Sequence, residues 1–227
     1  MILSLDTSTT VCSVALHTPA GTLLGCYDLY TERTASARLT TLVQEVVTHT
    51  GYTLADLSAI AVAKGPGSYT GLRIGVSTAK GLCMALDIPL IGVNTLAALT
   101  EQVRAFYPPH FLLCPLIDAR RMEVYCAVYE QNGRLLRETA AVILDEHAFA
   151  DLLPHRPMVF FGDGAAKAQP VLDQPNAHFP NGLVRPSARA VGTLAVAAYA
   201  AGQFEDLVRF EPYYLKEFRS TTPRQPA

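Results

Sequence analysis

The sequence predicts an α/β protein of two lobes, each built on a mixed sheet with flanking helices. Three β-rich runs precede the first amphipathic helix, and strand–helix units follow it. Opening hairpins followed by such units favour a mixed sheet, whereas a simple dinucleotide-binding fold would begin strand–helix–strand. The chain has 227 residues, of which 50% are hydrophobic and 17% charged. This composition excludes a disordered protein, which would be rich in charge and poor in aliphatic residues.

In the first half, runs of β-forming residues and amphipathic periodicity alternate along the chain. Apolar residues recur every three and four positions between residues 36 and 49, which is typical of a helix with one buried face. The short aliphatic run at 58–63 does not alternate, which indicates a strand buried on both faces. The expected elements are strands at 2–5, 11–17 and 22–30, a helix at 36–49, a strand at 58–63, a helix at 72–86, a strand at 90–93 and a helix at 96–106.

The second half repeats this order after a double proline at 108–109, which breaks the chain. We therefore predict a first lobe at 1–106 and a second at 107–206, with residues 207–218 packing back on the first lobe. Asp145 is expected to cap a helix that ends before Pro154, and Ser187 is expected to cap the last helix. The expected elements are strands at 112–117, 122–129 and 135–144, the helix after Asp145, a strand at 158–161 and a helix at 188–201.

Charge, cysteine content and apolar run lengths restrict the class of protein. The net charge is −2 and the pI about 6.3, so no overall basic field favours nucleic acid, and an RNA contact would need a local patch. The five cysteines form no C-x-x-C pair, which favours buried reduced thiols. Asp6 interrupts the first apolar run, unlike in a signal peptide, and no run reaches the roughly 18 residues of a membrane span. We expect a cytoplasmic protein.

The sequence motifs predict neither a catalytic residue nor a metal ligand. The loop between Gly65 and Gly71 lacks the lysine of a phosphate loop and the spacing of a dinucleotide loop. None of the six histidines forms H-x-x-x-H or H-E-x-x-H, and G-x-S-x-G is absent. Nothing pairs a nucleophile with an evident base. Tight turns explain these glycines better, with Ser68 or Thr70 as cap of the following helix.

Two short segments are candidates for nucleotide contacts, and each has a structural alternative. Asp6 and Ser8 follow the first strand, where a carboxylate and a hydroxyl could face a phosphate or its Mg²⁺, or could close an Asx-type turn. Gly162 and Gly164 could approach a nucleotide or only form a turn. In the segment 117–121, Asp118 is expected to pair with Arg120 and hold the turn.

The helix at 72–86 carries small residues along one stripe and apolar residues on nearly all other sides. It is either a core helix or, together with the helix at 36–49, a protein–protein surface. On the second interpretation, Gly75→Leu abolishes pairing and leaves a folded monomer. The candidate interface residues are Leu39, Leu42, Val43, Val46, Leu72, Gly75, Val76 and Ala79.

Several strings along nearly the whole chain resemble the bacterial TsaB family, also called YeaZ. The most specific is GPGSYTGLRIG at 65–75; the others lie at 2–8, 79–82, 117–125, 162–164 and 212–215. The resemblance implies an actin/Hsp70-like ATPase (ASKHA) fold of two ribonuclease-H-like lobes. It also implies a role in threonylcarbamoylation of the tRNA adenosine adjacent to the anticodon.

The resemblance further implies a non-catalytic subunit that dimerises with the related catalytic protein TsaD, joined by the ATPase TsaE. Pairing would use the first-lobe helices in a four-helix bundle, with a homodimer in isolation and tRNA contacted through the complex. Metal and ATP chemistry would lie on the partners, and weak nucleotide binding by this chain stays open. The helix at 36–49 has only His49 and lacks the H-x-x-x-H metal ligands of the catalytic relative.

Two alternatives use other features. A nucleotide hydrolase or metallopeptidase on the same fold would depend on Asp6 and on residues 162–164. A direct tRNA binder would depend on Lys216, Arg219 and Arg224, whose charge is sparse and salt-sensitive.

Overall fold

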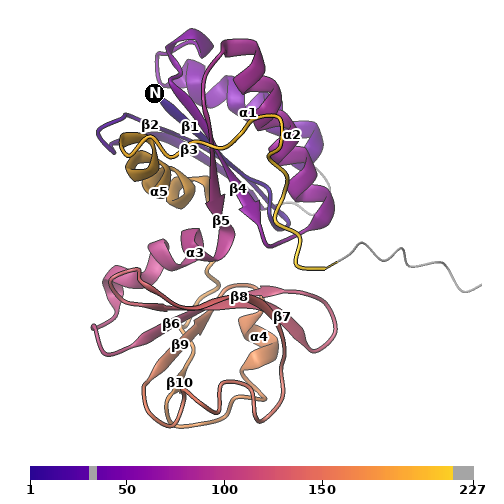
Figure 1. Cartoon of the computed structure of the whole chain (residues 1–227), viewed down its shortest axis with the longest axis vertical. Coiled ribbons are helices and arrows are strands. Elements are labelled where there is room, and N and C mark those ends of the chain that lie inside the picture. The colour runs from indigo at the N-terminus through magenta and orange to yellow at the C-terminus, as the bar shows by residue number, and fades with distance from the viewer. Residues whose placement is uncertain (31–34, 217–227) are drawn as a thin grey trace, which may run out of the picture.

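The computed structural model describes residues 1–30 and 35–216 of the chain. Figure 1 shows two lobes arranged one above the other, with helix α3 between their sheets. Each lobe contains a five-stranded sheet of three antiparallel strands and two that are added in parallel. The predicted fold class is confirmed, and the two halves share the same sheet order and strand directions, although the helices between their strands differ.

The first sheet has the order β3-β2-β1-β4-β5. Strands β1 and β2 are buried along their whole length, and β4 is buried except at Lys64. Such unbroken burial follows from helices on both faces and explains why these runs are aliphatic without alternation. The strands are β1 (Ile2–Asp6), β2 (Val11–His17), β3 (Leu23–Tyr30), β4 (Ala59–Gly65) and β5 (Leu90–Asn94).

Helices α1 (Ala35–His49) and α2 (Tyr69–Leu86) cover one face of this sheet. Their apolar side chains join those of β1, β2 and β4 in one core cluster. Helix α3 (Thr95–Val103) follows β5, with Asn94 as its cap, and two 3₁₀ turns complete the lobe, η1 (Leu54–Asp56) and η2 (Arg104–Phe106).

Helix α5 (Ala188–Ala200) covers the opposite face of the first sheet, which corrects its assignment to a second lobe at 107–206. Its small side chains allow the helix to lie close to the strands. A Cβ at Gly192 would lie 2.2 Å from the His17 ring, so only glycine fits there. The chain thus returns to the first lobe before α5 begins, and Ser187 caps the helix as predicted.

The second sheet has the order β10-β9-β6-β7-β8. The prediction of a helix after Asp145 is wrong, because that segment forms consecutive turns and Phe149 has a positive φ of 63°. Phe149 and Leu153 are nevertheless buried in the core of this lobe, so packing rather than helix geometry places them. The elements are β6 (Leu112–Asp118), β7 (Glu123–Glu130), β8 (Leu135–Ile143), β9 (Met158–Phe161), α4 (Ala165–Ala168) and β10 (Ala177–His178).

The segment after α5 runs back along the edge of the first sheet (Figure 1). The Glu205 amide donates to the Leu90 carbonyl at 2.9 Å, and the Tyr213 amide to the Lys64 carbonyl at 2.7 Å. The Phe210 ring lies over Gly92, where a Cβ would be 2.7 Å from the ring. Residues 205–214, which we call the strap, thus cover the β5 edge; residues 217 and 218 of the segment expected to pack back lie outside the described residues.

None of the helices in the described part of the chain has both the length and the apolar character that a membrane span needs.

Candidate functional site

The turn after β1 is closed by Asp6 and Ser8. Asp6 Oδ1 accepts from the Ser8 amide at 2.9 Å and from Ser8 Oγ at 2.6 Å. Both residues are at most 1% exposed, and within the described residues Asp6 Oδ2 has no hydrogen-bond partner. Burial raises the pKa of Asp6 to about 6. The expected phosphate contact would need this turn to open, whereas the Asx-type alternative matches the observed hydrogen bonds.

The loop before α2 packs directly on that turn. Ser68 caps α2 by accepting from the Gly71 amide at 3.3 Å, and the Ser68 amide donates to the Ser8 carbonyl at 2.6 Å. Thr7 Oγ1 donates to the Gly71 carbonyl at 2.7 Å. A Cβ at Gly71 would lie 2.0 Å from the Thr7 carbonyl oxygen, so this glycine is required by close approach of two backbones. The loop therefore packs the start of α2 against the turn after β1.

Gly162 and Gly164 have the same role in the second lobe. A Cβ at Gly162, whose φ is +106°, would lie 2.2 Å from the Leu116 carbonyl oxygen. The Gly164 amide donates to that carbonyl at 3.0 Å. Between them, Asp163 Oδ1 accepts from the Asp118 amide at 2.9 Å, and burial raises the pKa of Asp163. The G-D-G segment thus supports the β6–β7 loop rather than presenting open backbone to a ligand.

The β6–β7 loop is held by a cation that the sequence analysis did not identify. Asp118 Oδ1 accepts from the Arg120 backbone amide at 2.6 Å, so the expected pair forms through the main chain and not the guanidinium. Lys167 Nζ lies 2.8 Å from that oxygen and also donates to the Arg121 carbonyl at 2.9 Å. Arg120 and Arg121 both have positive φ, 65° and 51°. Lys167 lies far along the chain, so no sequence pattern links it to this loop.

The eight expected interface residues face inward, and the expectation that they contact a partner is wrong. The seven with side chains are at most 6% exposed, and Gly75 is buried against Thr7. Leu39, Leu42, Val43, Val46, Val76 and Ala79 belong to the core cluster between the helices and the sheet, and Leu72 is 1% exposed. The most apolar face of each helix is the one that the sheet covers.

The solvent side of α2 carries a different set of small residues. A Cβ at Gly81 would meet no atom within 4 Å, and Met84 is 73% exposed. Ile74 and Leu82, at the border toward the core, are partly exposed. We call this surface the α2 outer face; its exposed members are Thr70, Arg73, Ser77, Gly81, Met84 and Ala85.

The strap borders this outer face on one side. Lys80 Nζ donates to the Val208 and Phe210 carbonyls at 3.2 and 3.0 Å. The Tyr69 ring lies 4.8 Å from that of Tyr214, and the Arg73 guanidinium lies 5.0 Å from the Tyr69 centroid. The first turn of α2 and the strap therefore form one continuous surface.

Within the described residues, no three histidine, cysteine, aspartate or glutamate side chains gather where they could hold a metal ion. His49 Nδ1 lies 2.7 Å from the Tyr27 hydroxyl oxygen. Four cysteines are buried and Cys26 is half-buried, with no disulfide among these five residues of the described chain. Lys216 forms an ion pair with Glu123, while Arg219 and Arg224 of the expected tRNA-binding tail lie outside the described residues.

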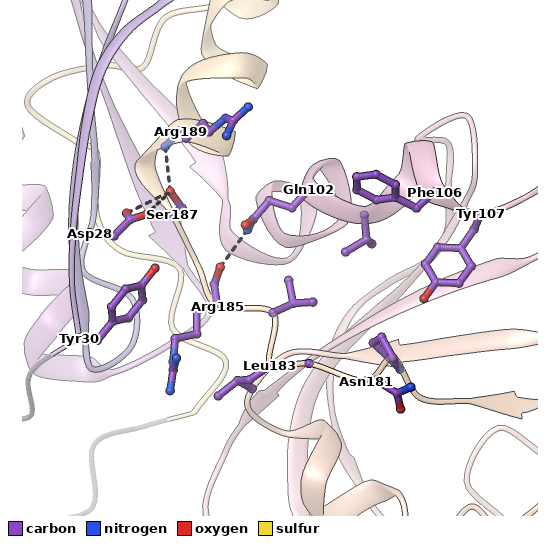
Figure 2. A pocket seen from close by; sticks show the side chains of 14 residues that line it. Asp28, Tyr30, Gln102, Phe106, Tyr107, Asn181, Leu183, Arg185, Ser187 and Arg189 are labelled. Atoms are coloured by element: carbon purple, nitrogen blue, oxygen red, sulfur yellow. Dashed lines mark hydrogen bonds between the residues drawn. The ribbon is translucent and has the colours of Figure 1, made fainter.

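A cleft of about 610 Å³ opens between the lobes (Figure 2). It is lined from β3, α3, η2 and the residue after it, the segment before α5 and the first turn of α5. These elements come from both halves of the chain, so only the fold brings them together.

Comparison with known proteins identifies the family. The model described as "TsaD: tRNA N6-adenosine threonylcarbamoyltransferase" matches residues 15–222. The chain is 32% identical to the tRNA threonylcarbamoyladenosine biosynthesis protein TsaB of Escherichia coli, over 95% of this chain and 94% of that protein. The chain belongs to the TsaB (YeaZ) family. YeaZ from Pseudomonas aeruginosa, a solved TsaB-family structure, is 31% identical and superimposes with a TM-score of 0.80, covering 94% of this chain and 99% of that one.

The ASKHA fold expected from the TsaB resemblance is confirmed by more distant structures. The ethanolamine utilization protein EutJ from Carboxydothermus hydrogenoformans superimposes with a TM-score of 0.53 at 10% identity, covering 84% of this chain and 88% of that one. This likeness shows the fold alone.

Proposed function

We propose that the chain acts in tRNA threonylcarbamoyladenosine biosynthesis as a non-catalytic scaffold or activator that dimerises with TsaD in a complex with TsaE. The observation that carries the proposal is the 32% identity to a TsaB protein over nearly the full length of both chains. On this proposal the chain has no metal or cofactor of its own. The metal and ATP chemistry belong to the partners, and tRNA is contacted through the complex.

We further propose that pairing uses the α2 outer face together with the exposed side of α1. Small residues at Ser77, Gly81 and Ala85 would let a partner helix approach to the short end of the usual 8–10 Å interaxial range. The partly exposed Ile74 and Leu82 and the exposed Met84 would supply apolar contact. In isolation the same surface would form a homodimer, since a second copy offers the same small residues for close approach and the same exposed Met84 for apolar contact.

The test is co-purification with the TsaD encoded in the same genome. Ala85→Arg places a long cation on the α2 outer face and should reduce the recovered complex at least tenfold. Ala197→Arg, also on an exposed helix position, is the matched control on α5 and should pair like the wild type. Light scattering should show that the Ala85→Arg variant, without TsaD, is a monomer where the wild type dimerises. Equal recovery of TsaD by the two variants would contradict this interface.

The rival activity, nucleotide hydrolysis, has little support from the site. Asp6 is buried and already accepts two hydrogen bonds from Ser8, so it is not positioned to orient a water molecule or Mg²⁺. Turnover of ATP by the isolated chain that is lost in Asp6→Asn would favour the rival instead.

A further inference from the structure

The two helices that carry the proposed pairing surface offer too few exposed residues for an interface of ordinary size. Among the residues whose burial is described, six positions of α1 and six of α2 are exposed. A standard interface takes about 20–30 residues from each partner. A partner that docks here with a standard interface therefore also contacts a neighbouring element. The exposed residues of α1 are Arg38, Thr40, Thr41, Gln44, Thr48 and His49.

The helices also provide few apolar contacts on this side. The six exposed residues of α1 are all polar, and among those of α2 only Met84 has a large apolar side chain. Ile74 and Leu82 are only partly exposed. The core of a protein–protein interface is apolar and enriched in methionine, arginine and aromatic residues. Further apolar contact has to come from an element beside Met84.

The strap lies beside Met84 and offers such contact. Val208 is 87% exposed, more than any other large apolar side chain in the described part of the chain. Its carbonyl accepts from Lys80 Nζ at 3.2 Å, and Figure 1 shows the strap passing next to α2. Residues four apart on a helix are neighbours, so Met84 and Val208 both border the Lys80 side chain. The two apolar side chains therefore belong to one surface.

The strap also enlarges this surface. Six of its residues are exposed, half as many again as the two helices offer, and the combined surface approaches the lower end of the standard range. Two of the six are tyrosines, a residue type that interfaces favour. The exposed residues of the strap are Asp206, Val208, Arg209, Glu211, Tyr213 and Tyr214.

Several contacts hold the strap in place before any partner arrives. Lys80 Nζ donates to the Phe210 carbonyl at 3.0 Å as well, and the Phe210 ring packs over Gly92. Lys64 Nζ lies 3.1 Å from Glu205 Oε1. A surface that is already ordered loses less conformational entropy on binding. The strap can thus present Val208 at little cost.

Charges of both signs are interspersed on the strap. Asp206 Oδ2 lies 3.7 Å from Arg209 Nε. Burial raises the pKa of Tyr214, on which Arg73 and Glu211 act in opposite directions. The remaining carboxylate of the strap is in the ion pair just described. A partner therefore meets no strong field of one sign here, and apolar and aromatic contact is the main attraction.

We propose that the strap is part of the surface that binds TsaD, with Val208 and Met84 as neighbouring apolar contacts. Lys80 is the residue that positions the strap, through its hydrogen bonds to two strap carbonyls. This inference rests on the proposed pairing with TsaD and adds a third element to the two helices. The region of TsaD that meets the strap is expected to be apolar.

The test is co-purification of the full chain with TsaD. Val208→Asp places a carboxylate at the apolar contact and should reduce the recovered complex at least tenfold. Ile143→Asp, at another β-branched residue that is 68% exposed, lies on β8 of the second lobe and is the matched control. It should pair like the wild type. Both side chains are exposed, so thermal unfolding of the two isolated variants should match that of the wild type.

Lys80 is tested through its effect on Val208. Lys80→Met removes both hydrogen bonds to the strap and should reduce the recovered complex at least threefold. Lys80→Arg retains a donor and should restore pairing. In the Lys80→Met background, Val208→Asp should cost less recovery than in the wild type, whereas a role of Lys80 in stability alone would leave that cost unchanged.

The outcomes separate this inference from the proposed function. If Val208→Asp and Ile143→Asp recover equal amounts of TsaD while Ala85→Arg recovers less, the inference is overturned and pairing through the helices stands. If the wild-type chain recovers no TsaD, the proposed function is overturned and the strap inference with it. If Val208→Asp abolishes the homodimer in light scattering but leaves recovery of TsaD unchanged, the strap binds a second copy instead, which also overturns the inference.

Discussion

Two glycines of the same helix should respond in opposite directions to the same substitution. A Cβ at Gly75 would lie 2.4 Å from Thr7 Oγ1, whereas one at Gly81 would meet no atom within 4 Å. Gly81→Ala should stabilise the fold by about 0.5–1 kcal/mol, because alanine lowers the entropy cost of ordering the helix. Gly75→Ala gains the same stabilisation from the lower entropy cost of helix formation. It must also displace a buried side chain, which costs about 1–3 kcal/mol through overpacking.

The displaced group at Gly75 is also a hydrogen-bond donor. Thr7 is 1% exposed and donates to the Gly71 carbonyl at 2.7 Å, so moving it weakens a buried hydrogen bond as well. We therefore expect Gly75→Ala to be less stable than Gly81→Ala by about 2–4 kcal/mol. Gly75→Leu, expected from the sequence to leave a folded monomer, should instead fail to fold because the larger side chain enlarges the clash.

The assay is urea denaturation of both variants, read as a shift of the midpoint at an unchanged slope of free energy against denaturant. A Thr7→Ala background removes the clashing oxygen, so Gly75→Ala should cost less there than in the wild type. If Gly75→Ala and Gly81→Ala prove equally stable, α2 does not pack on the turn after β1 as the structure has it.

The remaining predictions concern buried titratable groups. Burial raises the folded-state pKa of Asp6 to about 6 from 3.8, so its contribution to stability is complete below pH 3.8 and is lost as the pH rises through 6. Asp6→Asn should remove this loss, worth up to about 3 kcal/mol at pH 8, and urea midpoints between pH 4 and 8 measure it. Burial, and then the Arg189 charge, lower the pKa of His17, so the folded state keeps its full stability above pH 6.5 and loses it on acidification. His17→Gln should flatten that acid loss; an unchanged pH profile would show that His17 is not held neutral beneath α5.

The fold could be predicted from the sequence because its determinants are local. Aliphatic runs without alternation, a change to helical periodicity and the double proline each depend on neighbouring residues. The cap at Ser187 and the choice of Ser68 or Thr70 as the cap of α2 follow from the sequence for the same reason, since a hydroxyl at a helix start bonds to an amide two or three residues away, and the structure selects Ser68. The segment after Asp145 shows the limit: a cap-like residue before Pro154 predicted a helix, whereas the segment forms turns in which Phe149 and Leu153 are buried.

The candidate sites could be predicted only in part. Periodicity located the two helices of the first lobe, but both sides of α2 carry small residues, and spacing does not say which side the sheet covers. The structure places Gly75 inside and Gly81 outside. Helix α5 presents the same difficulty, because a helix rich in alanine can pack on either lobe.

The amino-acid order by itself thus determined most of the strands and helices and their caps, because each of these depends on contacts within a few residues, and the segment after Asp145 is the exception. Family membership was also readable there, from the string at 65–75. Tertiary packing alone decided that α5 covers the first sheet, that the apolar side of α2 is core, and that Tyr30, Phe106 and Arg185 share one cleft. Those three residues come from distant parts of the chain, and only the way the lobes close on each other makes them neighbours.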